Sequence, residues 1–216
     1  MRVTIDMKLT RTDLERWILD FADQIMEQHL VLSDLDAASG DADHGSNMER
    51  GMSALLKSVP DWDGAATPGE FLKEVGLHIV SSVGGSSGAL YGTIFLRMAR
   101  AVGDARTINA GLLSEAFEAA VQGVVDRGKV KQGDKTMLDA LAPSVQVLRA
   151  KLTDEKSLSE ALESAATAAE AGRDATSDMV ARKGKSSYAR ENSRGSIDPG
   201  ATSVAMLMRS AARTLG

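Results

Sequence analysis

The sequence predicts an all-α protein, a single domain over residues 1–216 folded as an eight-helix antiparallel barrel or bundle. Three observations lead to this prediction. Alanine, leucine, methionine and valine are plentiful while aromatic residues make up 4%, and such a composition favours helices over strands. Apolar residues recur at helical spacing in about eight segments, with no convincing strand alternation. Most links between the segments are short, so neighbouring helices should run antiparallel.

Four helices are predicted in the first half of the chain. Thr12 and Glu15 have capping-box spacing at the start of the first. Thr67 is followed by proline and then, at the third helical position, by glutamate, which is a strong start for the third. The glycines of residues 84–88 (GGSSG) break that helix. The predicted segments are 12–30, a helix from near Ser46 to before Pro60, 67 to about 83, and one that continues after 84–88 to Val102.

Four more helices are predicted in the second half. The fifth ends at Gly128, and the loop KVKQGDKT leads into the sixth. Ser157 and Glu160 have capping-box spacing for the seventh, which reaches about Val180. A long basic loop follows, and Asp198 with the proline after it opens the last helix.

The unusual residues lie in every second connection. If helices alternate up and down, the connections after the first, third, fifth and seventh helices meet at one end of the bundle. The intervening connectors 60–66, 103–109 and 152–156 are plain polar links. The four connections that should form one site are residues 36–45, 84–88, 128–136 and 183–200.

Three aspartates, Asp36, Asp41 and Asp43, lie close together in the segment DAASGDADHG. Because the chain contains no cysteine, a metal would have to bind oxygen or imidazole. Carboxylates suit Mg²⁺, Mn²⁺ or Ca²⁺ rather than zinc. An EF-hand is excluded, because counting from Asp41 puts Gly45 at the fifth position and Met52 at the twelfth. Mg²⁺ usually combines a few carboxylates with substrate phosphates, so a phosphate-bearing ligand is implied.

Three of the segments predicted at the same end of the bundle as the aspartates have features that favour binding of an anion. Residues 84–88 let backbone N–H groups and hydroxyls approach it. Residues 44–47 (HGSN) and 198–200 (DPG) lie at helix starts, where free N–H groups favour phosphate. The aspartates can also be helix caps, GGSSG a turn and 182–194 a solvated loop. The residues alone indicate a helical protein that binds a divalent cation and an anionic ligand. The lysines that could add positive charge are Lys129, Lys131, Lys135, Lys183 and Lys185.

Several other functions are disfavoured. The net charge of −5 argues against a nucleic-acid binder. No apolar run resembles a signal peptide or a membrane span, so no membrane association and a cytoplasmic location are expected. Residues 84–88 match the hydrolase pattern G-x-S-x-G, but every histidine precedes Ser86 and the segment before it is helical. Residues 128–136 resemble a P-loop with one extra residue and no preceding strand.

Four motifs carry a family resemblance: GDADHGSNMERG, SSVGGSSGALYGT, RGKVKQGDKTMLDAL and ARKGKSSYARENSRGSIDPGATS. In this order, over nearly the whole chain, they resemble the nucleotide-binding L subunit of dihydroxyacetone kinase. The resemblance implies an eight-helix antiparallel barrel and two Mg²⁺ ions held by Asp36, Asp41 and Asp43. Lys185 stands where the family often has arginine. Lysine keeps the positive charge but lacks the planar guanidinium fork for a phosphate contact. The implied ADP or ATP contacts are His44, Ser46, Asn47, Ser86, Ser87, Gly128, Met137, Lys185, Asp198 and Gly200.

The resemblance also implies a reaction and partners. The γ-phosphoryl group would pass from ATP to dihydroxyacetone held covalently on a separate K subunit. In a free-standing L chain, ADP would be retained and rephosphorylated by an M subunit of the phosphotransferase system. The alternatives are an ATP-exchanging L subunit for another small ketose, ADP-dependent binding to a transcription activator, and a metal-binding helical protein without a nucleotide.

Overall fold

The computed structural model describes residues 8–38, 40–62, 65–153 and 157–216. Among these residues, extended pairing is confined to a bridge between Leu9 and Ile108. The N-terminal residues 1–7 and parts of two predicted connectors, 63–64 and 154–156, lie outside the described ranges. The described α-helices are α1 (Arg11–Ala37), α2 (His44–Ser58), α3 (Pro68–Ser82), α4 (Gly85–Val102), α5 (Ala110–Gly128), α6 (Leu138–Thr153), α7 (Leu158–Ala175) and α8 (Pro199–Leu215), and the short 3-10 helices are η1 (Val59–Asp61), η2 (Thr176–Asp178) and η3 (Lys185–Ser193).

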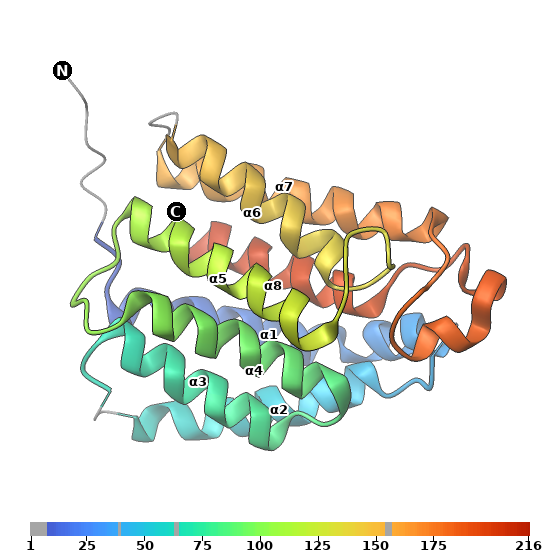
Figure 1. Cartoon of the computed structure of the whole chain (residues 1–216). Coiled ribbons are helices and arrows are strands. Elements are labelled where there is room, and N and C mark those ends of the chain that lie inside the picture. The colour runs from blue at the N-terminus through green and yellow to red at the C-terminus, as the bar shows by residue number, and fades with distance from the viewer. Residues whose placement is uncertain (1–7, 39, 63–64, 154–156) are drawn as a thin grey trace.

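The helices pack in chain order, and α8 returns to lie against α1, which closes the ring. This arrangement confirms the predicted all-α, eight-helix architecture for the described part of the chain. The C-terminus lies at one end of the bundle, whereas η3 and the loop after α5 lie at the other end (Figure 1). None of the described helices combines the length and apolar character that a membrane span requires.

Aromatic side chains join α1, α4 and α5 at the centre. Trp17 is fully buried, with its ring centroid 6.0 Å from that of Phe95 and 5.8 Å from that of Phe117. Its indole Nε1 donates to the carbonyl of Leu207 on α8 at 3.0 Å. A buried indole N–H needs a hydrogen-bond acceptor. Because the acceptor here belongs to α8, the bond also fixes α8 relative to α1.

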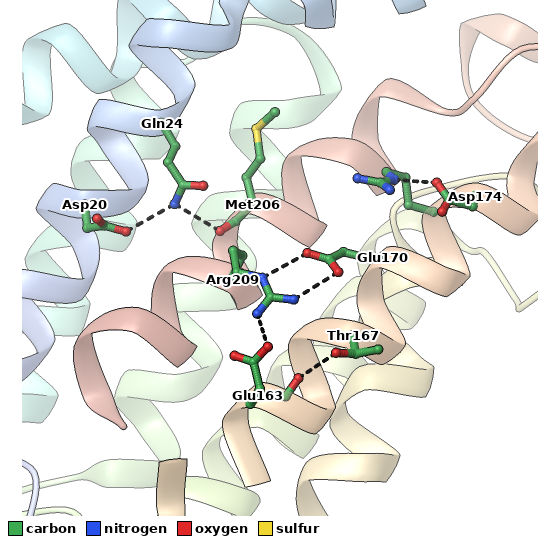
Figure 2. Close-up of polar contacts among 9 residues, drawn as sticks. Asp20, Gln24, Glu163, Thr167, Glu170, Asp174, Met206 and Arg209 are labelled. Carbon is green, nitrogen blue, oxygen red and sulfur yellow. Dashed lines mark hydrogen bonds and ion pairs between the residues drawn. The ribbon is translucent and has the colours of Figure 1, made fainter. Parts of the chain in front are cut away.

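Polar and charged side chains hold α8 against both of its neighbours, α7 and α1. The guanidinium of Arg209 on α8 donates to both carboxylate oxygens of Glu170 on α7, at 2.9 Å each. It also donates to Glu163, which lies about two turns earlier on α7 (Figure 2). On α1, Gln24 donates to the carbonyl of Met206 at 3.4 Å. The helix is thus fixed between α1 and α7, and its first turn is placed at the end of the bundle that carries η3.

The predicted start and end of the first helix are wrong. The N-cap is Thr10, whose hydroxyl accepts from the backbone N–H of Asp13, and the capping box pairs these two residues rather than Thr12 and Glu15. The helix runs to Ala37 instead of residue 30, because Leu32 and Asp36 continue its buried face. Asp36 therefore lies in the last turn of α1 and not in a loop.

Residues 84–88 are also not a loop. Only Gly84 precedes the helix as its N-cap, and α4 begins at Gly85, whose φ of +66° suits glycine. The seventh helix ends at Ala175 instead of about Val180, because Thr176 starts the 3-10 turn η2. The other predicted boundaries with a named cap are confirmed: Thr67, Gly128, Ser157 and Asp198.

Candidate functional site

A cavity of about 410 Å³ lies where the connections after α1, α3, α5 and α7 meet. Its walls include residues from all four segments that the sequence assigns to one end, so their predicted clustering at that end is confirmed. Eleven of the thirteen predicted site residues line this cavity: Asp36, Asp41, Asp43, His44, Ser86, Ser87, Gly128, Met137, Lys185, Asp198 and Gly200.

The other two predicted residues, Ser46 and Asn47, do not line the cavity. The hydroxyl of Ser46 donates to the carbonyl of Asp43 at 3.1 Å. Asn47 is buried, and its side-chain oxygen accepts from Arg50 at 2.8 Å. Both side chains are thus engaged within the first turns of α2, where they support the helix start that borders the cavity.

The three aspartates form one cluster. Asp36, Asp41 and Asp43 each offer a carboxylate oxygen, and these oxygens lie within 4.8 Å of one another. The Oδ2 of Asp36 accepts the backbone N–H groups of Asp43 at 2.9 Å and His44 at 3.1 Å. These bonds tie the last turn of α1 to the first turn of α2, so residues 36 and 43 are brought together by the backbone. The all-oxygen donor set fits a hard divalent cation.

Lys185 is the cationic partner of two of these carboxylates. Its Nζ donates to Asp41, and to Asp43 at 2.8 Å. Partial burial opposes ionisation of Asp43, but the hydrogen bond and charge of Lys185 outweigh it and lower the pKa of this carboxyl. The same hydrogen bonds raise the pKa of Lys185 above its usual value. The residue from η3 therefore reaches across the cavity mouth to the acidic cluster.

His44 lies between two hydroxyls. Its Nδ1 is 2.9 Å from Oγ of Ser87, and its Nε2 is 3.0 Å from Oγ of Ser203. The hydroxyl of Tyr91 donates to the same Ser203 oxygen at 2.8 Å. Burial lowers the pKa of His44 to about 4 even though Asp36 and Asp43 act in the opposite direction, so the imidazole is neutral at pH 7.

Two of these residues, Tyr91 and Ser203, are not predicted from the sequence. Tyr91 follows Ser87 by one helical turn, so the two share a face of α4. This signal is lost when the helix is assumed to begin after residue 88. Ser203 lies one turn after Gly200 among the apolar residues of α8, where nothing in the local spacing separates it from a core position.

Helix N-termini also border the cavity. The N-cap of α4 is Gly84, which has no side chain to cap the first-turn N–H groups next to Ser86 and Ser87. Backbone N–H groups and the helix dipole at such a terminus favour an anion. At α8 the N-cap is Asp198, whose Oδ2 accepts from the N–H of Ala201 at 2.7 Å. The start of α4 is consequently the better anion site of the two.

Asp198 is a buried carboxyl. Burial raises its pKa to about 7, the N–H of Ala201 acts against the shift, and the negative charge of Asp139 adds to it. Lys135 contributes a smaller opposing charge. Asp198 is therefore partly protonated near neutral pH while it still caps α8.

Lys135 lines the cavity but its amine is already bound. The side chain is 1% exposed, and Nζ donates to the carbonyls of Met179, Ser193 and Ser196. Its burial lowers the pKa of the amine. Lys135 thus fastens the segment that carries Lys185 instead of presenting a free charge, and sequence chemistry alone does not distinguish these two lysines.

Apolar side chains complete the walls. Leu90, Val124, Val130 and Met137 line the same cavity as the acidic cluster. A Cβ added at Gly128 would lie 3.3 Å from Val130 and 3.4 Å from Leu90. The glycine therefore leaves space next to an apolar wall, and the pocket as a whole suits a ligand with both an anionic and an apolar part.

The fold and the cavity together describe a class of all-α proteins that bind a ligand at one end of a helical bundle. In this chain one pocket combines a cluster of three carboxylates, a helix start without a side-chain cap, and apolar walls. The chain belongs to the DAK2 domain family, whose model matches residues 38–213. The resemblance predicted from the four motifs is confirmed by this match.

Two curated relatives are similar over nearly their whole length. The chain is 41% identical over 206 residues to the ADP-binding subunit DhaL of the PEP-dependent dihydroxyacetone kinase of Escherichia coli, covering 94% of this chain and 96% of that one. It is 42% identical over 200 residues to the ADP-binding subunit DhaL of PEP-dependent dihydroxyacetone kinase 1 of Listeria innocua, covering 92% and 94%.

A solved structure shares the fold. The dihydroxyacetone kinase of C. freundii in complex with AMP-PNP and Mg²⁺ matches with a TM-score of 0.71 at 22% identity. The match covers 99% of this chain and 36% of that kinase, so this chain spans about a third of it. The likeness shows that the helical arrangement is the same.

Proposed function

We propose that this chain is the ADP-binding L subunit of a dihydroxyacetone kinase, and that residues 1–216 form one L-type nucleotide-binding domain. One observation carries the proposal. The acidic cluster, Lys185 and the start of α4 line a single cavity, in a chain that is 41% identical to one DhaL subunit and 42% identical to another.

Asp36, Asp41 and Asp43 are proposed to hold two Mg²⁺ ions. Their oxygens lie within 4.8 Å of one another, and each is a hard ligand. When bound, the ions would neutralise charge on phosphate oxygens. Lys185 pairs with Asp41 and Asp43 in the structure, and cations at these carboxylates would free its amine for a phosphate oxygen.

The nucleotide is proposed to occupy the remainder of the cavity. Ser86 and Ser87 at the start of α4 would bind phosphate, and Gly128 with Met137 would face the base along the apolar wall. Ser46 and Asn47 lie outside the cavity lining, so their role would be to hold the first turn of α2. The full proposed set is His44, Ser46, Asn47, Ser86, Ser87, Gly128, Met137, Lys185, Asp198 and Gly200.

The proposed reaction transfers the γ-phosphoryl group to dihydroxyacetone bound covalently on a separate K subunit. ADP would remain bound and be rephosphorylated by a phosphotransferase-system M subunit. The support is that both DhaL relatives belong to PEP-dependent kinases and that this chain covers nearly all of each. A cytoplasmic location and ADP-dependent docking on a transcription activator stay predictions.

The test is native mass spectrometry of the purified protein before and after dialysis against Mg²⁺. We expect ADP to remain at about one per chain in the wild type and to be lost in Asp41→Asn. Asp41 is exposed, so this variant should fold normally. The matched control is Asp104→Asn, in the connector after α4 at the opposite end of the bundle, which should retain ADP.

The other outcomes separate the alternatives. Nucleotide that binds but dialyses away would favour an ATP-exchanging subunit, whose ketose would then be found by assay with different K-type partners. Absence of nucleotide under every condition would overturn the proposal and leave a metal-binding helical protein. If ADP is retained, phosphoenolpyruvate-driven turnover with K and M subunits tests the rest of the reaction.

A further inference from the structure

A row of hydrogen bonds runs from the core into the cavity. Tyr91 donates to Ser203, Ser203 lies 3.0 Å from His44 Nε2, and His44 Nδ1 lies 2.9 Å from Ser87. Tyr91, Ser203 and His44 are buried, whereas Ser87 is partly exposed and lines the cavity. The row connects α4, α8 and α2. Tyr91 and His44 also border the cavity, but Ser203 does not line it, and Ser87 carries the more exposed hydroxyl.

The proton of Ser203 has two acceptors within reach. The carbonyl of Gly200 is 3.1 Å away and His44 Nε2 is 3.0 Å away. If the proton goes to Gly200, then Nε2 of a neutral His44 must carry a proton and donate to Ser203. Nδ1 is then an acceptor and takes the proton of Ser87. In this arrangement Ser87 presents only lone pairs to the cavity.

The opposite arrangement makes Ser87 a donor. Ser203 donates to His44 Nε2, His44 Nδ1–H donates to Ser87, and the proton of Ser87 can point into the cavity. Losing the Ser203 hydrogen bond costs the carbonyl of Gly200 little. It lies in the first turn of α8, where the backbone N–H four residues later in the helix is its regular donor. An anionic ligand next to Ser87 favours this arrangement, since lone pairs facing an anion repel it.

We propose that Ser203 and Tyr91 are positioning residues that hold His44 with its proton on Nδ1 and thereby turn the Ser87 hydroxyl toward a phosphate group. The inference rests on the proposed function for the identity of the ligand. It requires no change in the charge of His44, because both arrangements contain a neutral ring. Tyr91 contributes by donating to Ser203, which makes the Ser203 hydroxyl a stronger donor to the ring.

The decisive measurement is the ¹⁵N NMR spectrum of the His44 ring in the wild-type protein with ADP and Mg²⁺. We expect Nδ1 to show the shift of a protonated nitrogen and Nε2 that of an unprotonated one. A proton on Nε2 alone, or on both nitrogens, in a sample that binds ADP would overturn this inference and leave the proposed function standing. Failure to bind ADP would overturn the proposed function and this inference with it.

A variant supplies the second readout. Ser203→Ala should weaken ADP binding about tenfold, since an oriented hydrogen bond to a charged group is lost, and the ring should lose its preference for Nδ1–H. Tyr91→Phe should have a smaller effect of the same sign. Unchanged affinity and an unchanged ring spectrum in Ser203→Ala would contradict the proposal.

The control is Ser210→Ala. Ser210 is also fully buried on α8. The acceptors of its hydroxyl are the carbonyl of Trp17 at 2.9 Å and the carboxylate of Asp20, neither of which lines the cavity. Its removal costs a buried hydroxyl in the same helix, so it reports any general loss of stability. ADP affinity and the His44 ring spectrum should both be unchanged in this variant.

Discussion

The backbone of Gly40 lies directly against the carboxylate of Asp36. A Cβ at position 40 would be 2.1 Å from Oδ1 of Asp36 and 2.9 Å from its Cγ. Meanwhile Oδ2 of Asp36 accepts two backbone N–H groups at the start of α2. The carboxylate therefore occupies the space that a side chain at position 40 would need, and glycine leaves that space open.

We expect Gly40→Ala to weaken divalent-cation binding roughly 10- to 100-fold, the usual effect of disturbing the support of a metal ligand. The methyl group would push Asp36 away from Asp41 and Asp43. Titration with Mn²⁺ alone, followed by the electron paramagnetic resonance signal of the free ion, measures this affinity. Gly111→Ala is the control, because its added Cβ would meet only Asn109 at 3.5 Å. Equal Mn²⁺ affinity in the two variants would contradict the role given to Gly40.

Two lysines of the cavity, which have the same side-chain chemistry, have different roles in the structure. Lys135 and Lys185 both follow glycine-containing stretches and both line the cavity. Lys135 is 1% exposed and donates to three backbone carbonyls, whereas Lys185 is about half exposed and pairs with two carboxylates. The first holds a loop and the second faces the proposed metal site, a difference that arises from burial.

At the scale of elements, α8 connects the core to the cavity. Its first turn carries Asp198 and Gly200 into the lining, and further along Arg209 holds it against α7 through two glutamates (Figure 2). Glu170 accepts with both oxygens and has a side-chain exposure of 33%, while Glu163 accepts with one and is 62% exposed. The two contacts should therefore differ in strength.

We expect Glu170→Gln to lower the free energy of unfolding by about 1 kcal/mol and Glu163→Gln by less than about 0.5 kcal/mol, since exposed ion pairs contribute little. Urea unfolding at low salt measures both. The difference should shrink at high salt because screening weakens the pairs. Equal losses in the two variants would show that the paired geometry at Glu170 adds nothing.

The start of α4 shows how a boundary error hides a site residue. Sequence patterns place glycines at helix ends, so GGSSG is predicted as a loop. In the structure the segment is the first turn of α4, where Gly88 allows close packing: a Cβ there would lie 2.1 Å from the carbonyl of Val83. Because Ser87 is then helical, Tyr91 falls one turn behind it and reaches Ser203.

For the whole molecule, Asp198 makes stability depend on pH. Its pKa in the folded protein is about 7, above the value of about 4 expected in an unfolded chain. Below both values the carboxyl is protonated in both states and carries no penalty. As pH rises between them the unfolded chain loses its proton first, so the folded state is progressively disfavoured, and the full penalty is reached above pH 7.

We expect Asp198→Asn to stabilise the ligand-free protein, with a gain that grows from pH 5 to pH 8. Asparagine keeps the N-cap bond to Ala201 and removes the charge. Urea unfolding of both proteins at several pH values measures the gain, which should reach on the order of a few kcal/mol, given about 1.4 kcal/mol per unit of pKa shift.

Asp198→Ala is the companion variant, because it removes the charge and the cap together. Its pH trend should run parallel to that of Asp198→Asn, but lower by about 1 kcal/mol for the lost cap. A constant difference between wild type and Asp198→Asn over this pH range would show that burial does not shift this carboxyl.

Much of the architecture is predictable from local sequence. Capping boxes at Thr67 and Ser157, the end at Gly128 and the cap at Asp198 set helix boundaries through bonds between residues at most a few positions apart. Alternation of antiparallel helices then places four connections at one end. Eleven of thirteen predicted site residues meet there because they lie in those connections or in the helix turns beside them.

Local sequence patterns are therefore enough to predict the helical class, the order of the helices and the kinds of ligand atoms that gather at one end. Helix packing places His44 between Ser87 and Ser203 and engages the amine of Lys135 with backbone carbonyls. It also leaves Ser46 and Asn47 outside the cavity lining. The reason is the length scale of the interactions. Backbone periodicity and caps act over a few residues, whereas His44 and Ser203 are 159 positions apart and Tyr91 and Ser203 are 112 apart. Their meeting depends on how α2, α4 and α8 pack.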